Sequence, residues 1–163
     1  MRASAYSGAG GNYLSYQCSG PPFRSIILLI HGFAGSSDYF QRNFDALVKE
    51  HSIVAPDLRG HGRLNSPNSA RHHHAAVLAA DQRCLVILLK ERRAGEDPKQ
   101  GPPTTIVPVG RPLGAAILWA YVEMFGCDDF AGFVFIDQAP LQAVSNLPLV
   151  EPWDQGARPL LLP

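Results

Sequence analysis

An uninterrupted apolar run, Ile26 to Ile30, narrows the possible folds of this chain more than any other feature. Five apolar residues in a row without alternation are typical of a strand that is covered on both faces, as in the middle of a parallel sheet. Consecutive parallel strands need crossover connections, which are usually helices. The run therefore predicts a central strand in an α/β fold.

Strand and helix patterns alternate along the rest of the chain. Apolar residues at helical spacing predict helices over residues 40–48, 75–93 and 114–125. Short apolar runs predict further strands over residues 53–55, 104–109 and 133–136. Ser36, Ser37 and Asp38 are the expected caps of the first helix. Repeated strand–helix units imply right-handed crossovers, so we expect a parallel sheet in a three-layer α/β/α arrangement.

Length and composition indicate one folded domain without a charged binding surface. The chain has 163 residues, of which 46% are hydrophobic and 17% are charged, enough for one sizeable core. Fourteen basic and fourteen acidic residues give a formal charge of zero, which disfavours nucleic acid and membrane surfaces as partners. We expect an N-terminal arm at 1–24 with an exposed strand or hairpin, a core at 25–140 and an irregular, proline-rich tail at 141–163 that resembles the start of a lid.

The cysteines and the N-terminus favour a cytoplasmic protein. Three cysteines, far apart and without a CxxC pair, suggest neither a disulfide framework nor a zinc site. No apolar segment near the N-terminus resembles a signal peptide, and no apolar run approaches the ~18 residues of a membrane span. Gly8 precedes its strand, which argues against a dinucleotide-binding motif, and no P-loop is present. We expect no cofactor and no metal.

The turns that follow the predicted strands are where a site would form, because ligands bind at the carboxyl ends of parallel strands. The turn after Ile30 reads His31-Gly32-Phe33-Ala34-Gly35, whose small residues let backbone N–H groups face a cavity. The turn after Val109 reads Gly110-Arg111-Pro112-Leu113-Gly114, which has the G-x-S-x-G spacing of a nucleophile elbow. Taken alone, the first of these turns is better explained as a plain strand-to-helix loop with glycine for flexibility.

The ordered set of motifs IILLIHGFAGSSDYF, DLRGHG and GRPLG before a helix resembles the α/β-hydrolase superfamily, of the AB hydrolase-1 type. The resemblance extends from about Tyr13 to Pro140. It implies the N-terminal part of that fold and a parent activity, the hydrolysis of an ester, epoxide or similar small substrate by a nucleophile–His–acid triad.

The resemblance also implies roles for individual residues. The backbone N–H groups of Phe33 and Leu113 would form an oxyanion hole, and His31 and Gly32 would shape its loop. Gly110 and Gly114 would be the elbow glycines. The family's structural turn would be held by Asp57, Arg59, Gly60 and Gly62, and His61 is expected to be structural.

Two departures from the family pattern bear on activity. Pro112 occupies the nucleophile position, and proline has no nucleophilic atom and a φ near about −65° rather than the strained positive φ of an elbow. The chain also has no histidine after His74 that could be the general base. His72 to His74 are expected to be a solvated helix start rather than a metal site. Asp137 is either a polar strand terminus or the triad acid.

These observations leave three hypotheses. The first is a hydrolase-type enzyme that is inactive as this chain stands, because nucleophile and base are missing. The alternative is a non-catalytic α/β-hydrolase-like binding module for a small-molecule ligand. The third is a partial chain, from an incomplete gene model or a degraded paralogue. In each case the strand Phe133–Ile136 would be a sheet edge at which self-association is possible.

Overall fold

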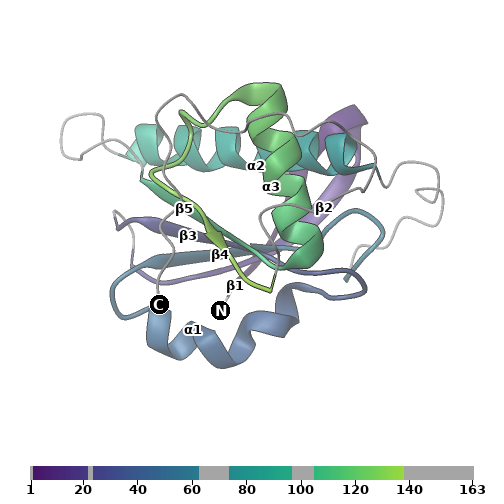
Figure 1. Cartoon of the computed structure of the whole chain (residues 1–163). Coiled ribbons are helices and arrows are strands. Elements are labelled where there is room, and N and C mark those ends of the chain that lie inside the picture. The colour runs from purple at the N-terminus through teal and green to yellow at the C-terminus, as the bar shows by residue number, and fades with distance from the viewer. Residues whose placement is uncertain (1, 22–23, 63–73, 97–104, 138–163) are drawn as a thin grey trace.

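The computed structural model describes residues 2–21, 24–62, 74–96 and 105–137. The described residues form one six-stranded sheet in the order β1-β2-β4-β3-β5-β6 (Figure 1). The strands are β1 (Arg2–Ser7), β2 (Tyr13–Ser19), β3 (Ile26–Ile30), β4 (Ser52–Pro56), β5 (Ile106–Gly110) and β6 (Val134–Phe135). The predicted tail at 141–163 and the residues His72 and His73 lie outside the described residues.

The four strands that alternate with helices are parallel, as predicted. Strand β3 pairs in parallel with β4 and β5, and β5 pairs in parallel with β6. Ile30 lies opposite Gly110, and Gly110 lies opposite Phe135, so the carboxyl ends of these three strands meet at one edge. The N-terminal hairpin makes the sheet mixed, because β2 is antiparallel to both β1 and β4.

The N-terminal hairpin belongs to the sheet and is not an exposed appendage. Strand β2 lies between β1 and β4, so both of its edges are hydrogen-bonded. Leu14 and Tyr16 are 4% and 1% exposed, whereas Tyr13 is 74% exposed. The expectation of an exposed strand is therefore wrong for the buried face of β2. The alternation of apolar and polar residues in this segment did not show that its inward side chains would pack in one cluster with residues of α2.

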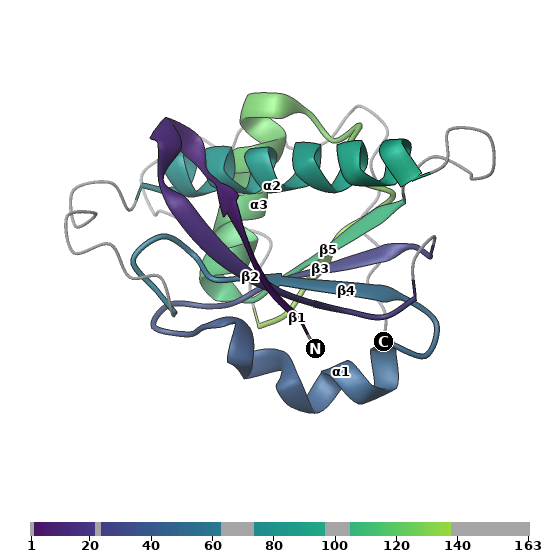
Figure 2. The ribbon, with the colours of Figure 1, turned by 180° about the vertical axis from the view of Figure 1, so that it is seen from behind.

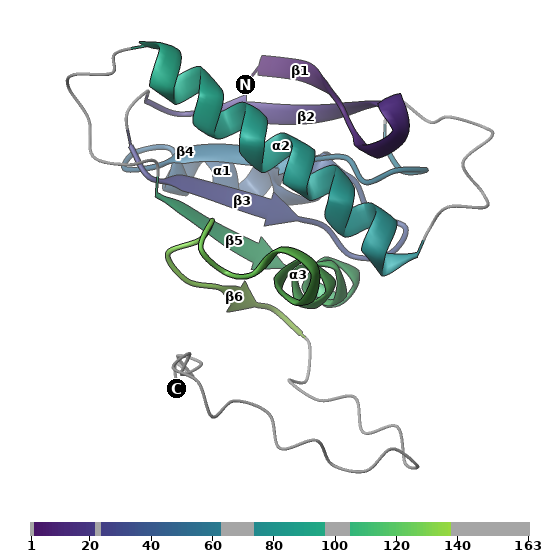
Figure 3. The ribbon, with the colours of Figure 1, turned by 90° about the horizontal axis from the view of Figure 1, so that it is seen from above.

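Helices cover both faces of the sheet, which confirms the three-layer arrangement. Helices α2 (Ala75–Glu96) and α3 (Pro112–Phe125) pack on one face, and α1 (Gln41–Leu47), preceded by the 3-10 turn η2 (Ser37–Phe40), packs on the other (Figures 1 and 2). Seen from above, α2 runs obliquely across the strands while α3 lies over β5 and β6 (Figure 3). A second 3-10 turn, η1 (Ala9–Gly11), joins β1 to β2.

The two cores explain the uninterrupted apolar run. Leu28 and Ile30 of β3 belong to a cluster with residues of α2 and α3, whereas Leu29 packs with Phe40 and Phe44 of the opposite layer. Successive side chains of a strand point to opposite faces, so a strand with helices on both sides needs apolar residues at every position. The run thus places β3 at the centre of the molecule.

The expected caps of the first helix are used elsewhere. Ser36 lies at the N-cap of η2 but its side chain makes no capping hydrogen bond. Ser37 and Asp38 instead accept hydrogen bonds from the Gln17 side chain of β2. Asp38 also accepts a hydrogen bond from Gln41 at 3.0 Å. The capping prediction is therefore wrong: these side chains tie the loop after β3 to the hairpin.

No helix in the described part of the chain is long and apolar enough to cross a membrane.

Candidate active site

The turns after β3 and β5 lie against each other at the carboxyl edge of the sheet. The backbone N–H of Arg111 donates to the carbonyl of Ile30 at 3.1 Å. A side-chain atom placed on Gly32 would be 3.7 Å from both Arg111 Cβ and Pro112 Cδ. The loop expected to form the oxyanion hole and the turn expected to form the elbow are therefore brought together by the fold.

Small residues at the elbow let α3 approach the sheet closely. A Cβ on Gly110 would be 2.6 Å from the backbone nitrogen of Ala115. A Cβ on Gly114 would collide with the backbone carbonyl of Ile30. Any larger residue at either position would push α3 away from β3 and β5, because backbone atoms cannot move aside as a side-chain tip can.

Pro112 opens α3 in an ordinary helical conformation. Arg111 is the N-cap, with φ −86° and ψ 174°, and Pro112 is the first helical residue. Among the described non-glycine residues, positive φ occurs at Ala34 and Asp137 and not at Pro112. The prediction of a strand, turn and helix with a negative φ at Pro112 is therefore confirmed. The helix begins two residues earlier than predicted, since proline is well suited to the first helical position.

His31 is buried and held as a neutral ring. Its Nε2 accepts the backbone N–H of Leu58 at 3.0 Å, so the ring proton is on Nδ1, which donates to the carbonyl of Gly32 at 2.7 Å. Burial lowers the pKa of His31 below its usual 6.5, and the neighbouring His61 lowers it further. Both ring nitrogens are engaged in backbone contacts that fix the loop, so His31 is not placed to act as a base.

The loop after His31 presents backbone donors and one exposed ring. The described part of the chain holds no hydrogen-bond acceptor for the backbone N–H of Phe33 or of Leu113. Ala34 has φ 56°, and its N–H donates to Nε2 of His61 at 3.3 Å. The Phe33 side chain is 82% exposed. The two N–H groups expected to form the oxyanion hole are thus not engaged by described residues.

The turn after β4 is held by the buried carboxylate of Asp57, as the structural role expected for this turn requires. Asp57 accepts hydrogen bonds from the backbone N–H of Ser37 at 2.7 Å and from the hydroxyl of Ser15 at 2.5 Å. A side chain on Gly62 would collide with the Asp57 carboxylate. Nδ1 of His61 donates to the carbonyl of Arg59 at 3.1 Å. These side chains are occupied in holding backbone and are not free for chemistry.

Arg59 makes a buried ion pair that the sequence did not reveal. Its Nε and Nη2 atoms bond both carboxylate oxygens of Asp81 in α2, at 2.9 and 2.6 Å. Nη2 also donates to the carbonyl of Ala9 at 2.6 Å, and the Ala9 N–H donates to Asp81 at 2.8 Å. The pair therefore joins the turn after β4, the N-terminal hairpin and α2. No pattern near residue 81 marked it, because the partners are far apart in the chain.

The structure places the expected acid, Asp137, next to the elbow, and the described histidines His51 and His74 on other elements. Asp137 is exposed, with φ 57°, directly after Ile136, whose N–H donates to the carbonyl of Gly110 at 2.9 Å. His51 lies at the other end of the strands and is hydrogen-bonded to the Ser25 hydroxyl at 2.6 Å. His74 precedes α2. No group of His, Cys, Asp or Glu side chains in the described ranges could hold a metal ion.

Arg111 and Tyr39 also lie at this edge, and sequence reasoning missed both. The Arg111 guanidinium lies 4.4 Å from the centre of the Tyr39 ring. Arg111 is an unassigned position of the G-x-S-x-G spacing and Tyr39 directly precedes the predicted helix over residues 40–48, so neither residue stood out. The one available signal was the charge of Arg111, which stands between the elbow glycine Gly110 and the predicted helix.

Comparisons with known proteins agree with this geometry. A family model described as the alpha/beta hydrolase family matches residues 27–163. A comparison with curated proteins found no match. Among solved structures, an esterase from Exiguobacterium antarcticum is 16% identical with a TM-score of 0.70, covering 84% of this chain and 46% of that one.

Two further esterases are similar in the same way. One from Rhodococcus sp. ECU1013 is 21% identical with a TM-score of 0.67, and a thermophilic one from Thermogutta terrifontis is 20% identical with a TM-score of 0.64. Both matches cover 85% of this chain and 46% of the other. The chain therefore spans less than half the length of these solved relatives. With the family model matched over most of its length, the chain belongs to the α/β-hydrolase family.

Proposed function

We propose that this chain retains the scaffold of an ester- or epoxide-hydrolysing enzyme but does not itself catalyse hydrolysis. The observation that carries the proposal is Pro112, which stands as the first residue of α3 where the family presents its nucleophile. Proline has no hydroxyl, thiol or carboxylate that could attack a substrate. The esterases to which the chain is similar suggest the parent reaction, the hydrolysis of an ester.

A second observation is that His31, His51 and His61 are not placed as a general base for Pro112. His31 and His61 at the carboxyl edge both hold backbone groups, and His51 lies at the opposite end of the strands. No histidine follows His74 in the 163 residues. Loss of the nucleophile alone costs on the order of a millionfold in turnover, and the oxyanion hole preserves only a small residual acceleration.

The test is turnover of short-chain aryl esters and of an epoxide by the purified chain. We expect no hydrolysis above the rate in buffer, and we expect Pro112→Ser alone not to rescue activity, because no described histidine is placed as a base for the new hydroxyl. Turnover that survives repurification and is lost on changing a residue of the carboxyl edge would overturn the proposal.

A second candidate function, a non-catalytic binding module for a small molecule, rests on the loop after β3. The N–H groups of Phe33 and Leu113 are not engaged by described residues, and the loop is held against the elbow although Pro112 has replaced the nucleophile. Binding needs no nucleophile, so these donors could still hold a ligand oxygen. Ligand binding without turnover distinguishes this function from hydrolysis.

We also propose that a second copy of the chain pairs with β6 and that the protein is cytoplasmic. Strand β6 is the last strand of the described sheet, and the side chains of Val134 in β6 and of Ile136 just after it are 44% and 41% exposed. An apolar edge without charge favours pairing with another strand. The cytoplasmic location is supported by the cysteines Cys18, Cys84 and Cys127, all of which are free thiols.

A further inference from the structure

Arg111 is held in place by its backbone on both sides. Its N–H donates to the carbonyl of Ile30 at 3.1 Å, and its own carbonyl accepts the N–H of Ala115 at 2.6 Å. Its Cβ lies beside Gly32 of the loop after β3. The start of this side chain is therefore fixed between the two turns that form the carboxyl edge of the sheet.

The charged end of Arg111 has an aromatic neighbour but no carboxylate partner among the described residues. The guanidinium lies 4.4 Å from the centre of the Tyr39 ring. No ion pair or side-chain hydrogen bond joins Arg111 to another described residue. The adjacent acid, Asp38, is occupied by Gln17 and Gln41. Stacking on a ring uses the face of a guanidinium and leaves the N–H groups at its rim free to donate.

A guanidinium that no described carboxylate pairs with and an exposed ring together favour one class of ligand. The planar fork of Arg matches the two oxygens of a carboxylate and binds them through parallel hydrogen bonds. Phe33, the residue after Gly32, is 82% exposed and offers an aromatic surface at the same edge. A neutral ester or amide would gain the contact with the Phe33 ring but not the charge-assisted hydrogen bonds with Arg111.

We propose that Arg111 makes the candidate site selective for small organic carboxylates with a flat apolar body. This inference rests on the binding function proposed above and names the ligand class of that same site. Arg111 would pair with the carboxylate, Tyr39 would hold the guanidinium in position, and Phe33 would contact the apolar body. No bond is made or broken in this role.

The experiment is a calorimetric titration of the full chain at low salt with 2-naphthoate and, separately, with 2-naphthamide. The two probes share the ring system and differ in charge. We expect the wild-type chain to bind the carboxylate about tenfold or more tightly than the amide, the scale of one charge-assisted hydrogen-bonded pair. This comparison needs no variant, so it does not depend on how a substitution folds.

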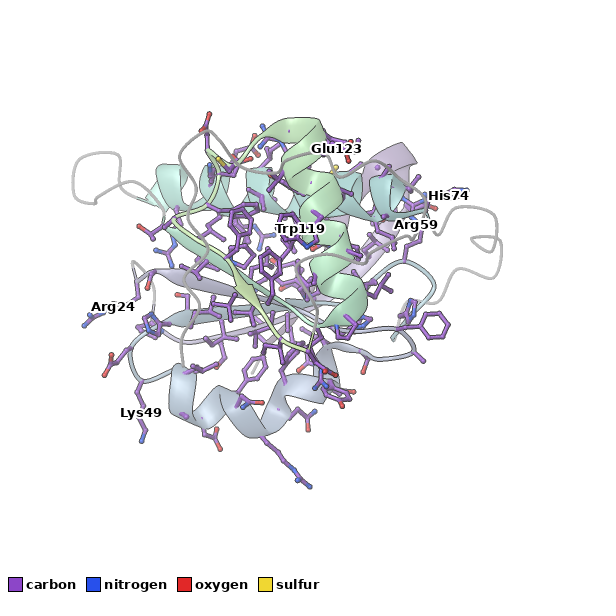
Figure 4. The ribbon with its side chains drawn as sticks, in the orientation of Figure 1. Arg24, Lys49, Arg59, His74, Trp119 and Glu123 are labelled. Carbon is purple, nitrogen blue, oxygen red and sulfur yellow. The ribbon has the colours of Figure 1, made fainter. Side chains whose placement is uncertain are left out.

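Variants then locate the preference. We expect Arg111→Gln to abolish it and Arg111→Lys to retain part of it, since lysine keeps the charge but not the fork. The matched control is Arg24→Gln, because Arg24 is exposed and lies at the opposite end of the molecule from Arg59 and the carboxyl edge (Figure 4). Arg24→Gln should leave both affinities unchanged.

The outcomes separate the two proposals. Equal affinity of the wild-type chain for both probes, or a preference that survives in Arg111→Gln, would overturn the role of Arg111 while leaving the binding function standing. Failure of the wild-type chain to bind either probe at millimolar concentration would count against the binding function and this inference together.

Discussion

At the scale of single residues, His31 shows why a residue type does not reveal its role. A histidine beside a glycine-rich turn has the chemistry of a general base, yet both of its ring nitrogens bond backbone groups of the loops after β3 and β4. From the sequence we expected His31 to shape this loop. The sequence could not predict the partner Leu58, because that contact depends on how two separate turns meet.

The buried state of His31 predicts a pH dependence. Its folded-state pKa lies below 6.5, so below about pH 6.5 the unfolded chain binds more protons at this site than the folded chain. The free energy of unfolding should therefore fall as the pH decreases from 6.5 through the folded-state pKa, and the contribution should be fully present above 6.5. Titration of the His31 ring protons by NMR checks this, and a midpoint at or above 6.5 would refute it.

Gly114 predicts a packing defect on substitution. A Cβ at this position would collide with the carbonyl of Ile30, so Gly114→Ala should destabilise the fold by about 1–3 kcal/mol through overpacking. The matched control is Gly132→Ala, where a Cβ meets nothing within 4 Å. Urea denaturation of both variants measures the difference. Equal stabilities would show that α3 can move away from β3 at little cost.

At the scale of elements, local patterns located the helices and strands but not their ends or edges. The stripe from Ile117 to Phe125 identified α3, while its start at Pro112 depended on proline being suited to the first helical position. Strand β6 was expected over Phe133–Ile136 and is shorter, because only Val134 and Phe135 pair with β5. Register and pairing are properties of two strands, so one segment cannot fix them.

The position of β6 at the edge of the described sheet predicts concentration-dependent association. A charge at the edge opposes pairing with another strand, so Val134→Lys should shift the protein toward monomer. Ile87→Lys is the matched control, because Ile87 is 41% exposed on α2, away from the sheet edge. Light scattering coupled to size-exclusion chromatography measures the masses. A wild-type chain that is monomeric throughout, or an equal shift in both variants, would contradict edge pairing.

At the scale of the whole molecule, the order of motifs predicted the fold, and the long-range polar contacts remained hidden. Four predicted strands that alternate with three predicted helices were sufficient to predict the three layers. The role of the N-terminal hairpin was missed, since Ser15 reaches Asp57 and Ala9 reaches Arg59 across more than forty residues of sequence. Such contacts leave no periodic signal, because each partner is a single polar residue.

The buried Arg59–Asp81 pair predicts a large effect on global stability. Asp81→Asn removes the charge that balances a buried guanidinium and should cost about 3–5 kcal/mol of unfolding free energy. Asp45→Asn is the matched control, because Asp45 is exposed on α1. Thermal and urea denaturation compare the two. Similar midpoints for both variants would show that the pair is not needed to join the hairpin, the turn after β4 and α2.

The central claim is that the fold of a hydrolase is present here without its nucleophile. The most direct test treats the 17.7 kDa chain with an excess of a fluorophosphonate, which reacts covalently with activated serine nucleophiles, and measures the intact mass. We predict an unchanged mass, with a known serine hydrolase labelled in parallel. A stoichiometric adduct that maps to a serine at the carboxyl edge, such as Ser36 or Ser37, would contradict the account.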